Sequence, residues 1–208
     1  MNSVVLIGLL GVAQGVRHAL EPDHVTAVAT VMVRTPSAKR GIAYAASWGL
    51  GHGAVLVVVG GLLVLLGARL PDSVSSFLEL GVGAMLVILG VRAFREARKT
   101  QTAADVPTVA RAARQPFVIG LVHGLAGSSA LAAVVALGAA TREHAIASLV
   151  LYAVGTTLGM LVLATLAGPV LARLGKTPRF ATGLVRFAGA ASIVVGVIWS
   201  IKTIADLV

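Results

Sequence analysis

Two imidazoles and two carboxylates stand within seven residues of an otherwise apolar segment near the N-terminus. The segment His18–His24 reads HALEPDH. An ionisable side chain at the centre of a membrane span costs roughly 2.5–3.5 kcal/mol on insertion scales, so another interaction has to offset that cost. A divalent metal ion does so, because it neutralises carboxylate charge and coordinates the lone pairs of neutral imidazoles. These residue types therefore indicate a metal site.

Pro22 decides whether these side chains can meet at one ion. On a straight helix, the side chains of His18, Asp23 and His24 would point about 0°, 140° and 240° around the axis. The ring of Pro22 clashes with the carbonyl of His18 and lacks a backbone donor, so it kinks or breaks a helix. Pro22 also suits the first position of a new half-helix, with Glu21 at its cap. A break at Pro22 would let the three side chains converge.

The composition indicates a membrane protein. Of 208 residues, 57% are hydrophobic and 12% are charged, and the mean hydropathy is +0.94. An average soluble domain carries about 25% charged residues. Cysteine is absent, which excludes disulfides, thiolate metal sites and catalytic thiols. The chain has no phosphate-binding Gly-x4-Gly-Lys-Ser/Thr motif and no recognisable enzyme active site, so we expect no enzyme activity.

Six stretches are apolar enough to cross a bilayer, which takes about 20 residues per helix. They are residues 3–33, 42–68, 74–91, 117–140, 145–171 and 183–204. The loops after the first, third and fifth stretches carry three, six and three basic residues, whereas the other two loops carry one each. The positive-inside rule then places the basic loops in the cytoplasm and both termini outside a cell (plasma or inner) membrane. The net charge of +9 follows from these loops and does not require nucleic acid.

The two halves of the chain match each other weakly and in order. The matching pairs are Gly15–Leu20 with Gly120–Leu125, Tyr44–His52 with Tyr152–Met160, and Gly83–Val91 with Gly189–Val197, at offsets of 105, 108 and 106 residues. Three spans per repeat is an odd number, so the second copy must cross the membrane in the opposite direction. The expected fold is an all-α membrane protein of two inverted three-helix repeats, residues 1–98 and 115–208, joined by a basic cytoplasmic linker, residues 99–114.

Other polar side chains in apolar segments could complete the metal set. His52 is the first candidate, because it lies between two glycines that allow another helix to approach at its level. The weaker candidates are the second carboxylate of the motif and three residues of the second repeat: Glu21, His123, Ser128 and Ser129. A lone histidine in a membrane span is more often a hydrogen-bonded packing residue than a ligand, and for His123 both interpretations stay open.

The motif resembles the nickel/cobalt transporter family (NiCoT), whose signature is His-x4-Asp-His in a membrane helix. The family's second motif, Leu-Gly-His-Ser-Thr-Val-Val, is similar to residues 50–56, which read LGHGAVL. The resemblance implies that the metal-handling residues are His18, Asp23, His24 and His52. The chain is similar in size to the short urease-accessory-type branch of the wider NicO superfamily. Longer members carry an acidic Asp-Thr-Ala-Thr-Glu motif in the second half, where residues 124–130 read GLAGSSA without a carboxylate.

The sequence and this resemblance predict a membrane permease for Ni²⁺, with Co²⁺ as a second substrate, bound near the membrane midplane. Uptake is favoured, because related exporters tend to have glycine at the position of Asp23. Three alternatives stay open: a nickel/cobalt exporter, an exporter of small anions such as sulfite, and a non-transporting accessory protein that handles nickel. The expected partners are the metal ion, the bilayer, and either a second copy of the chain or nickel-enzyme assembly proteins. No prosthetic group is expected.

Overall fold

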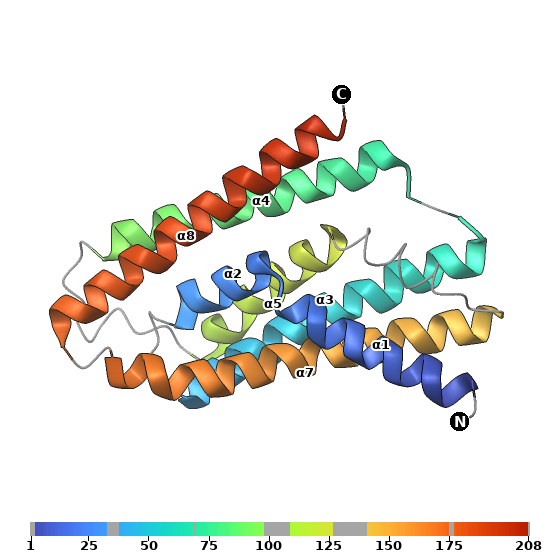
Figure 1. Ribbon diagram of the computed structural model, residues 1–208, viewed down its shortest axis with the longest axis horizontal. Helices are drawn as coiled ribbons and strands as arrows, with labels where there is room; N and C mark the ends of the chain where they lie inside the picture. The colour runs from blue at the N-terminus through green and yellow to red at the C-terminus, as the bar shows by residue number, and fades with distance from the viewer. Residues whose placement is uncertain are drawn as a thin grey trace.

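All regular secondary structure in the described part of the chain is α-helical. The computed structural model describes residues 3–32, 38–68, 70–97, 109–126, 141–174 and 177–207. The helices are α1 (Ser3–Ala19), α2 (Pro22–Met32), α3 (Ala38–Leu66), α4 (Asp72–Glu96), α5 (Val109–Ala126), α7 (Arg142–Leu174) and α8 (Pro178–Ala205) (Figure 1). The prediction of an all-α protein is therefore confirmed.

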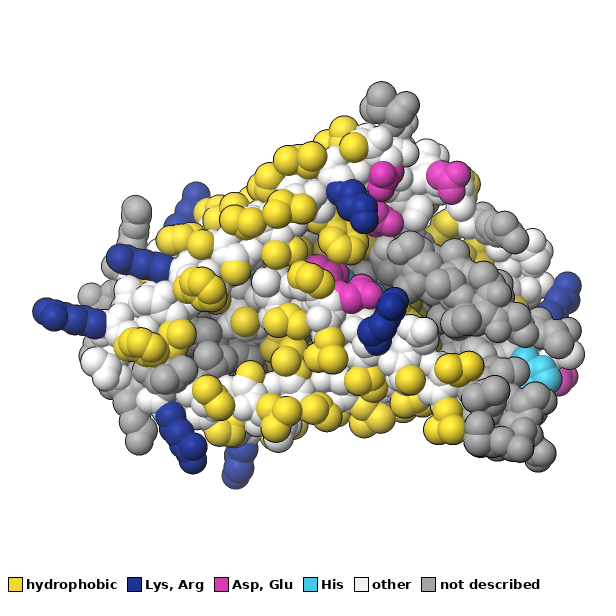
Figure 2. Space-filling view, in the orientation of Figure 1, with side chains coloured by type: hydrophobic (Ala, Val, Ile, Leu, Met, Phe, Trp, Pro, Cys, Tyr) yellow, Lys and Arg dark blue, Asp and Glu magenta, His cyan; other side chains and the backbone are white. Residues whose placement is uncertain are grey.

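Four of these helices are long and apolar enough to cross a membrane. The spans are Gly41–Leu66, Asp72–Arg95, Arg142–Ala167 and Arg179–Ala205. Hydrophobic side chains are spread over the face of the molecule that Figure 2 shows, and Phe77 and Phe187 are each 74% exposed. A water-soluble protein rarely exposes so continuous an apolar surface. The protein is therefore a multi-pass membrane protein.

The first predicted span is divided into α1 and α2. The N–H groups of Leu20 and Glu21 donate to the carbonyls of Arg17 and His18, each at 3.0 Å. Such three-residue bonds tighten the last turn of a helix. Pro22 then starts α2, as expected of a residue with a fixed φ and no N–H. The predicted break at Pro22 is present. The fourth predicted span covers part of α5 and residues 127–140, which lie outside the described part.

Glycines set the distances between the helices that surround the break. Gly15 on α1 lies against the backbone of Tyr152 and Thr156 on α7, and Gly120 on α5 lies against the backbone of Trp48 on α3. Because lipid supplies no hydrophobic force that drives membrane helices together, they associate by close packing, which small residues permit. The order of these contacts makes α1 parallel to α7 and α5 parallel to α3, as Figure 1 shows. A side chain at either glycine would separate these helices.

Helices α4 and α8 form an antiparallel pair beside this group (Figure 1). Gly83 lies against Gly196, and Gly90 lies against Gly189. Between the two glycine contacts, the Oγ of Ser192 donates to the carbonyl of Leu86 at 2.8 Å. The pair therefore packs backbone to backbone along its centre.

Basic side chains gather at one end of the molecule. In Figure 2 most Lys and Arg project from the left end, where Figure 1 shows α4 and α7 ending and α3 and α8 beginning. Exposed basic residues of these helix ends include Lys39, Arg92, Arg95, Arg173 and Arg179. Both termini lie away from this end (Figure 1). The distribution agrees with the loop charges in the sequence.

Candidate metal centre

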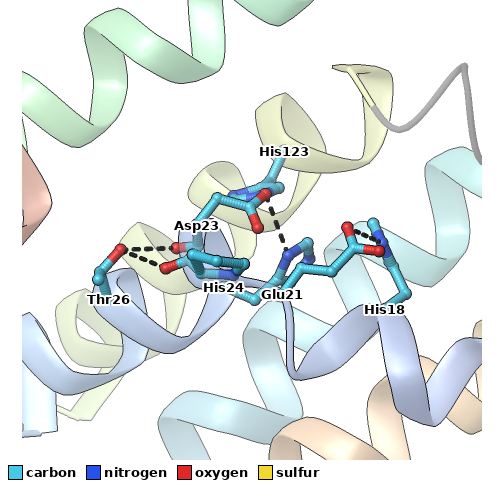
Figure 3. Close-up of polar contacts among 7 residues, drawn as sticks. His18, Glu21, Asp23, His24, Thr26 and His123 are labelled. Atoms are coloured by element: carbon cyan, nitrogen blue, oxygen red, sulfur yellow. Dashed lines mark hydrogen bonds and ion pairs between the residues drawn. The ribbon is translucent and has the colours of Figure 1, made fainter. Parts of the chain in front are cut away.

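Four imidazoles and one carboxylate meet at the break between α1 and α2. His18 ends α1, Asp23 and His24 begin α2, and two further histidines come from the middle of α3 and the end of α5: His52 and His123. None of the five residues is more than 7% exposed. Figure 3 shows His18, Asp23, His24 and His123 lying close together around the break. The side chains of His18, Asp23 and His24 therefore converge at the break, as predicted from Pro22.

The first cluster within this centre is His18, His24 and His52. One nitrogen from each ring lies within 4.8 Å of the other two. The ring centroids are 4.4 Å apart for His18 and His24, and 5.2 Å apart for His24 and His52. Two nitrogens that bind one metal ion at about 2.1 Å each lie at most about 4.2 Å apart. Small side-chain rotations would bring this cluster to coordination distance.

A second cluster shares His24 and contains Asp23 and His123. The Nε2 of His123 donates to the Oδ2 of Asp23 at 2.7 Å. The same oxygen lies 3.2 Å from the Nδ1 of His24, and the rings of His24 and His123 are 4.1 Å apart. The ligand atoms of this trio also lie within 4.8 Å of one another. The two clusters are thus neighbouring three-residue sets joined at His24.

Several polar atoms of the centre have no hydrogen-bond partner among the described residues. They are His18 Nε2, Asp23 Oδ1, His24 Nε2, both ring nitrogens of His52, and His123 Nδ1. Each such buried group costs about 1–3 kcal/mol when unsatisfied. A cation bound between them would use these lone pairs and so offset the cost. The donor set, imidazole nitrogen with one carboxylate, suits divalent Ni, Co, Zn and Cu.

Three neighbouring side chains hold the imidazoles in place. The Oε2 of Glu21 accepts a hydrogen bond from the Nδ1 of His18 at 2.9 Å, which leaves the Nε2 lone pair of His18 for an ion. The ring of Trp48 is stacked on His24, with 5.9 Å between centroids and 3° between planes. The ring of Tyr152 lies 5.6 Å from that of His18.

The structure brings together all of the predicted metal residues that it describes. His18, Asp23, His24 and His52 meet at one centre, and His123 joins them through Asp23. Glu21, predicted as a weaker ligand, is bonded to His18. Ser128 and Ser129 lie outside the described residues.

Two aromatic residues that were not predicted as part of the centre, Trp48 and Tyr152, lie against its imidazoles. Trp48 lies one helical turn before His52 on α3, so its spacing could have suggested that it shares the face of that histidine. Tyr152 comes to the centre only because α7 packs on α1, and the sequence carried no signal for that contact.

The family model for HupE/UreJ proteins matches residues 7–203. The chain belongs to the HupE/UreJ family. This is a nickel-uptake family of membrane transport and accessory proteins and not of enzymes. The expected relation to nickel/cobalt transporters and their urease-accessory branch is confirmed.

Two relatives resemble the chain over most of its length. The urease accessory protein UreH of Bacillus sp. (strain TB-90) is 31% identical over 218 residues, covering 95% of this chain and 92% of that protein. The chloroplast protein FOR GROWTH AND FERTILITY 1 of Arabidopsis thaliana is 30% identical over 169 residues, covering 72% of this chain and 46% of that protein. No solved structure matches the chain.

Proposed function

We propose that this HupE/UreJ protein is a permease that takes up Ni²⁺, with Co²⁺ as a second substrate. One observation carries the proposal: four buried imidazoles and one carboxylate converge, and each has at least one ring nitrogen or carboxylate oxygen without a hydrogen-bond partner among the described residues. Affinity order alone does not choose among divalent metals that favour imidazole. The family association supports nickel among them. In this proposal His18, Asp23, His24 and His52 handle the ion, with His123 as a further ligand, and they do so as the two three-residue clusters that share His24.

The two overlapping clusters provide successive positions for one ion. His24 belongs to both, so it stays bound while His18 and His52 are exchanged for Asp23 and His123. Two divalent ions, one in each of two clusters that share a residue, would repel each other strongly in a medium of low dielectric. A single ion that moves between the clusters therefore accounts for the geometry better than two ions bound together. Such a shared ligand removes the need to release the ion fully inside the protein.

The proposal includes six crossings arranged as two inverted repeats. Positions 83 and 90 of the first half correspond to 189 and 196 of the second half at the offset of 106 residues. The contact of Gly83 with Gly196 therefore maps onto the contact of Gly90 with Gly189. A two-fold axis in the membrane plane would relate these pairs, and inverted-repeat transporters bind their substrates beside such an axis. These reciprocal contacts support the repeat boundaries 1–98 and 115–208.

Hydrogen bonds that join equivalent positions also support this axis. The Oγ1 of Thr157 donates to the carbonyl of Gly49 at 3.2 Å, and these residues are 108 positions apart, the offset of their repeat segments. Ser192 and Leu86, also hydrogen-bonded, are 106 positions apart. A residue can contact its own equivalent only close to the two-fold axis. We further propose, from the positive-inside rule, that the basic end is cytoplasmic and that both termini lie outside.

An accessory role is the second candidate. A relative that covers 95% of the chain is named a urease accessory protein. A protein with that role would bind nickel at the same centre and pass it to proteins that assemble a nickel enzyme. The two roles differ in a measurable property, because only the permease moves ions across a sealed membrane by itself.

Flux into proteoliposomes tests the permease. We expect Ni²⁺ and Co²⁺ uptake by the full chain, little Zn²⁺ uptake, and no sulfite flux. His24→Ala should reduce the Ni²⁺ rate by roughly a hundredfold, the upper end of the range for residues of a metal site, because His24 belongs to both clusters. His52→Ala and His123→Ala each remove one cluster and should reduce the rate about tenfold or more.

His144→Ala, on the first turn of α7 away from the centre, is the matched control. Equal flux in His24→Ala and His144→Ala would remove the proposal. Metal binding without flux would select the accessory role.

A further inference from the structure

A groove of about 590 Å³ lies between α4 and α5, and its lining residues are separate from the metal centre. Residues of one face of α4, from Gly81 to Arg92, form one wall, and residues from Arg114 to Val122 of α5 form the other. Figure 1 shows α4 ending and α5 beginning at the same end of the molecule. The side chains of Arg92 and Arg114 therefore mark the same end of the groove.

The groove is as long as one leaflet of a membrane is thick. Eleven residues separate Gly81 from Arg92 along α4, which corresponds to roughly 16 Å of helix. The hydrocarbon core of a bilayer is about 30 Å thick, so one leaflet accounts for about half of it. The groove therefore extends from the basic end of the molecule to about the depth of the membrane midplane.

The two parts of the groove differ in chemistry. Its walls are apolar and include Met85, Ile88 and Val118, with Gly81 at the deep end, where a β-carbon would meet no heavy atom within 4 Å. Its open end carries two exposed guanidinium groups. Arginine binds phosphate through paired N–H groups, and basic pockets between membrane helices bind anionic lipid headgroups.

We propose that the groove binds one anionic phospholipid of the leaflet at the basic end. Arg92 and Arg114 hold its phosphate, and one acyl chain fills the apolar part as far as Gly81. A free phosphate would leave the apolar walls uncovered. A second copy of the chain would cover the walls with an apolar helix and leave the two guanidinium groups without an anion. The phospholipid satisfies both parts of the groove at once.

Lipid binding to the full chain in detergent tests the proposal. Native mass spectrometry would compare dioleoyl phosphatidylglycerol, dioleoyl phosphatidylcholine and inorganic phosphate as probes. We expect the anionic phosphatidylglycerol to bind in preference to the zwitterionic phosphatidylcholine. Because each arginine near an anionic surface changes affinity about fivefold, the double variant Arg92→Gln/Arg114→Gln should bind it about thirtyfold more weakly. Arg95→Gln/Arg179→Gln removes the same charge from the same end outside the groove and should keep the affinity.

A second variant tests the acyl chain separately from the headgroup. Gly81→Leu fills the deep end, and the open space there means that the leucine does not disturb the fold. It should weaken both lipids alike. Unchanged selectivity in Arg92→Gln/Arg114→Gln would overturn the proposal, as would equal binding of the two lipids. Binding of phosphate that matches the lipid would indicate a free anion instead, and a dimer lost in Gly81→Leu would indicate a second copy.

Discussion

At the scale of single residues, the metal centre depends on which nitrogen of each imidazole is free. His18 donates from Nδ1 to Glu21, and His123 donates from Nε2 to Asp23. In both cases the other ring nitrogen is buried and has no hydrogen-bond partner in the described part of the chain. A hydrogen bond on one nitrogen of a neutral imidazole fixes the lone pair on the other, which is how partners outside the ligand set orient metal-binding histidines. We therefore propose that Glu21 orients the ring of His18 and is not itself a ligand.

Substitution of Glu21 separates these roles. Glu21→Ala should weaken Ni²⁺ binding about 10–100-fold, since the tautomer and orientation of His18 are no longer fixed. Glu21→Gln keeps an acceptor oxygen and should stay within a few-fold of the natural chain. Equilibrium dialysis of the purified protein with Ni²⁺ measures both. Glu79→Ala is the control, because it removes a carboxylate of α4 that accepts a hydrogen bond from Thr203 of α8. A loss in Glu21→Gln as large as in His18→Ala would make Glu21 a ligand instead.

At the scale of helices, the break between α1 and α2 creates the centre. The last bonds of α1 and the start of α2 at Pro22 turn the chain by just enough to place His18, Asp23 and His24 together. The other two histidines, His52 and His123, lie near them because α3 and α5 pack closely through glycines. Gly124, the residue after His123, lies against the backbone of His52. Close helix contact in a membrane depends on such small residues.

Removal of Pro22 tests the break directly. Pro22→Ala restores a backbone donor and a strong helix former, so α1 and α2 should join into one helix. The side chains of His18, Asp23 and His24 would then point in different directions. We expect Ni²⁺ to lose most of its stabilising effect in a thermal unfolding scan in detergent. Pro169→Ala changes a proline inside α7 and should keep the full nickel shift. A full nickel shift in Pro22→Ala would show that the break is dispensable.

At the scale of the whole molecule, the two halves are alike in packing and unlike in chemistry. Gly15 and Gly120 occupy corresponding places, and each lies against the backbone of its partner helix. The first half contributes four of the five residues of the centre, and the second contributes His123. In the proposed arrangement the ion would therefore lie beside the two-fold axis with ligands mostly from the first half.

Labelling of single cysteines tests the orientation, because the natural chain has no cysteine. Thr177→Cys places a thiol at the basic end and Ser73→Cys places one at the opposite end, both at exposed positions. With a membrane-impermeant maleimide, intact cells should label Ser73→Cys only, and permeabilised cells should label both. The reverse pattern would put the basic end outside, against the charge rule.

The sequence by itself determined the membrane environment of this protein and the residue types of most of its candidate ligands. Ionisable residues in apolar surroundings indicate a membrane metal site, and Pro22 indicates the break, because both follow from local physics: the cost of a charge in hydrocarbon and the geometry of the proline ring. The tertiary structure alone decided the part of His123, the sharing of His24 between two clusters, and the groove between α4 and α5. Asp23 and His123 are 100 residues apart, so their contact depends on how helices pack, and no local pattern encodes it.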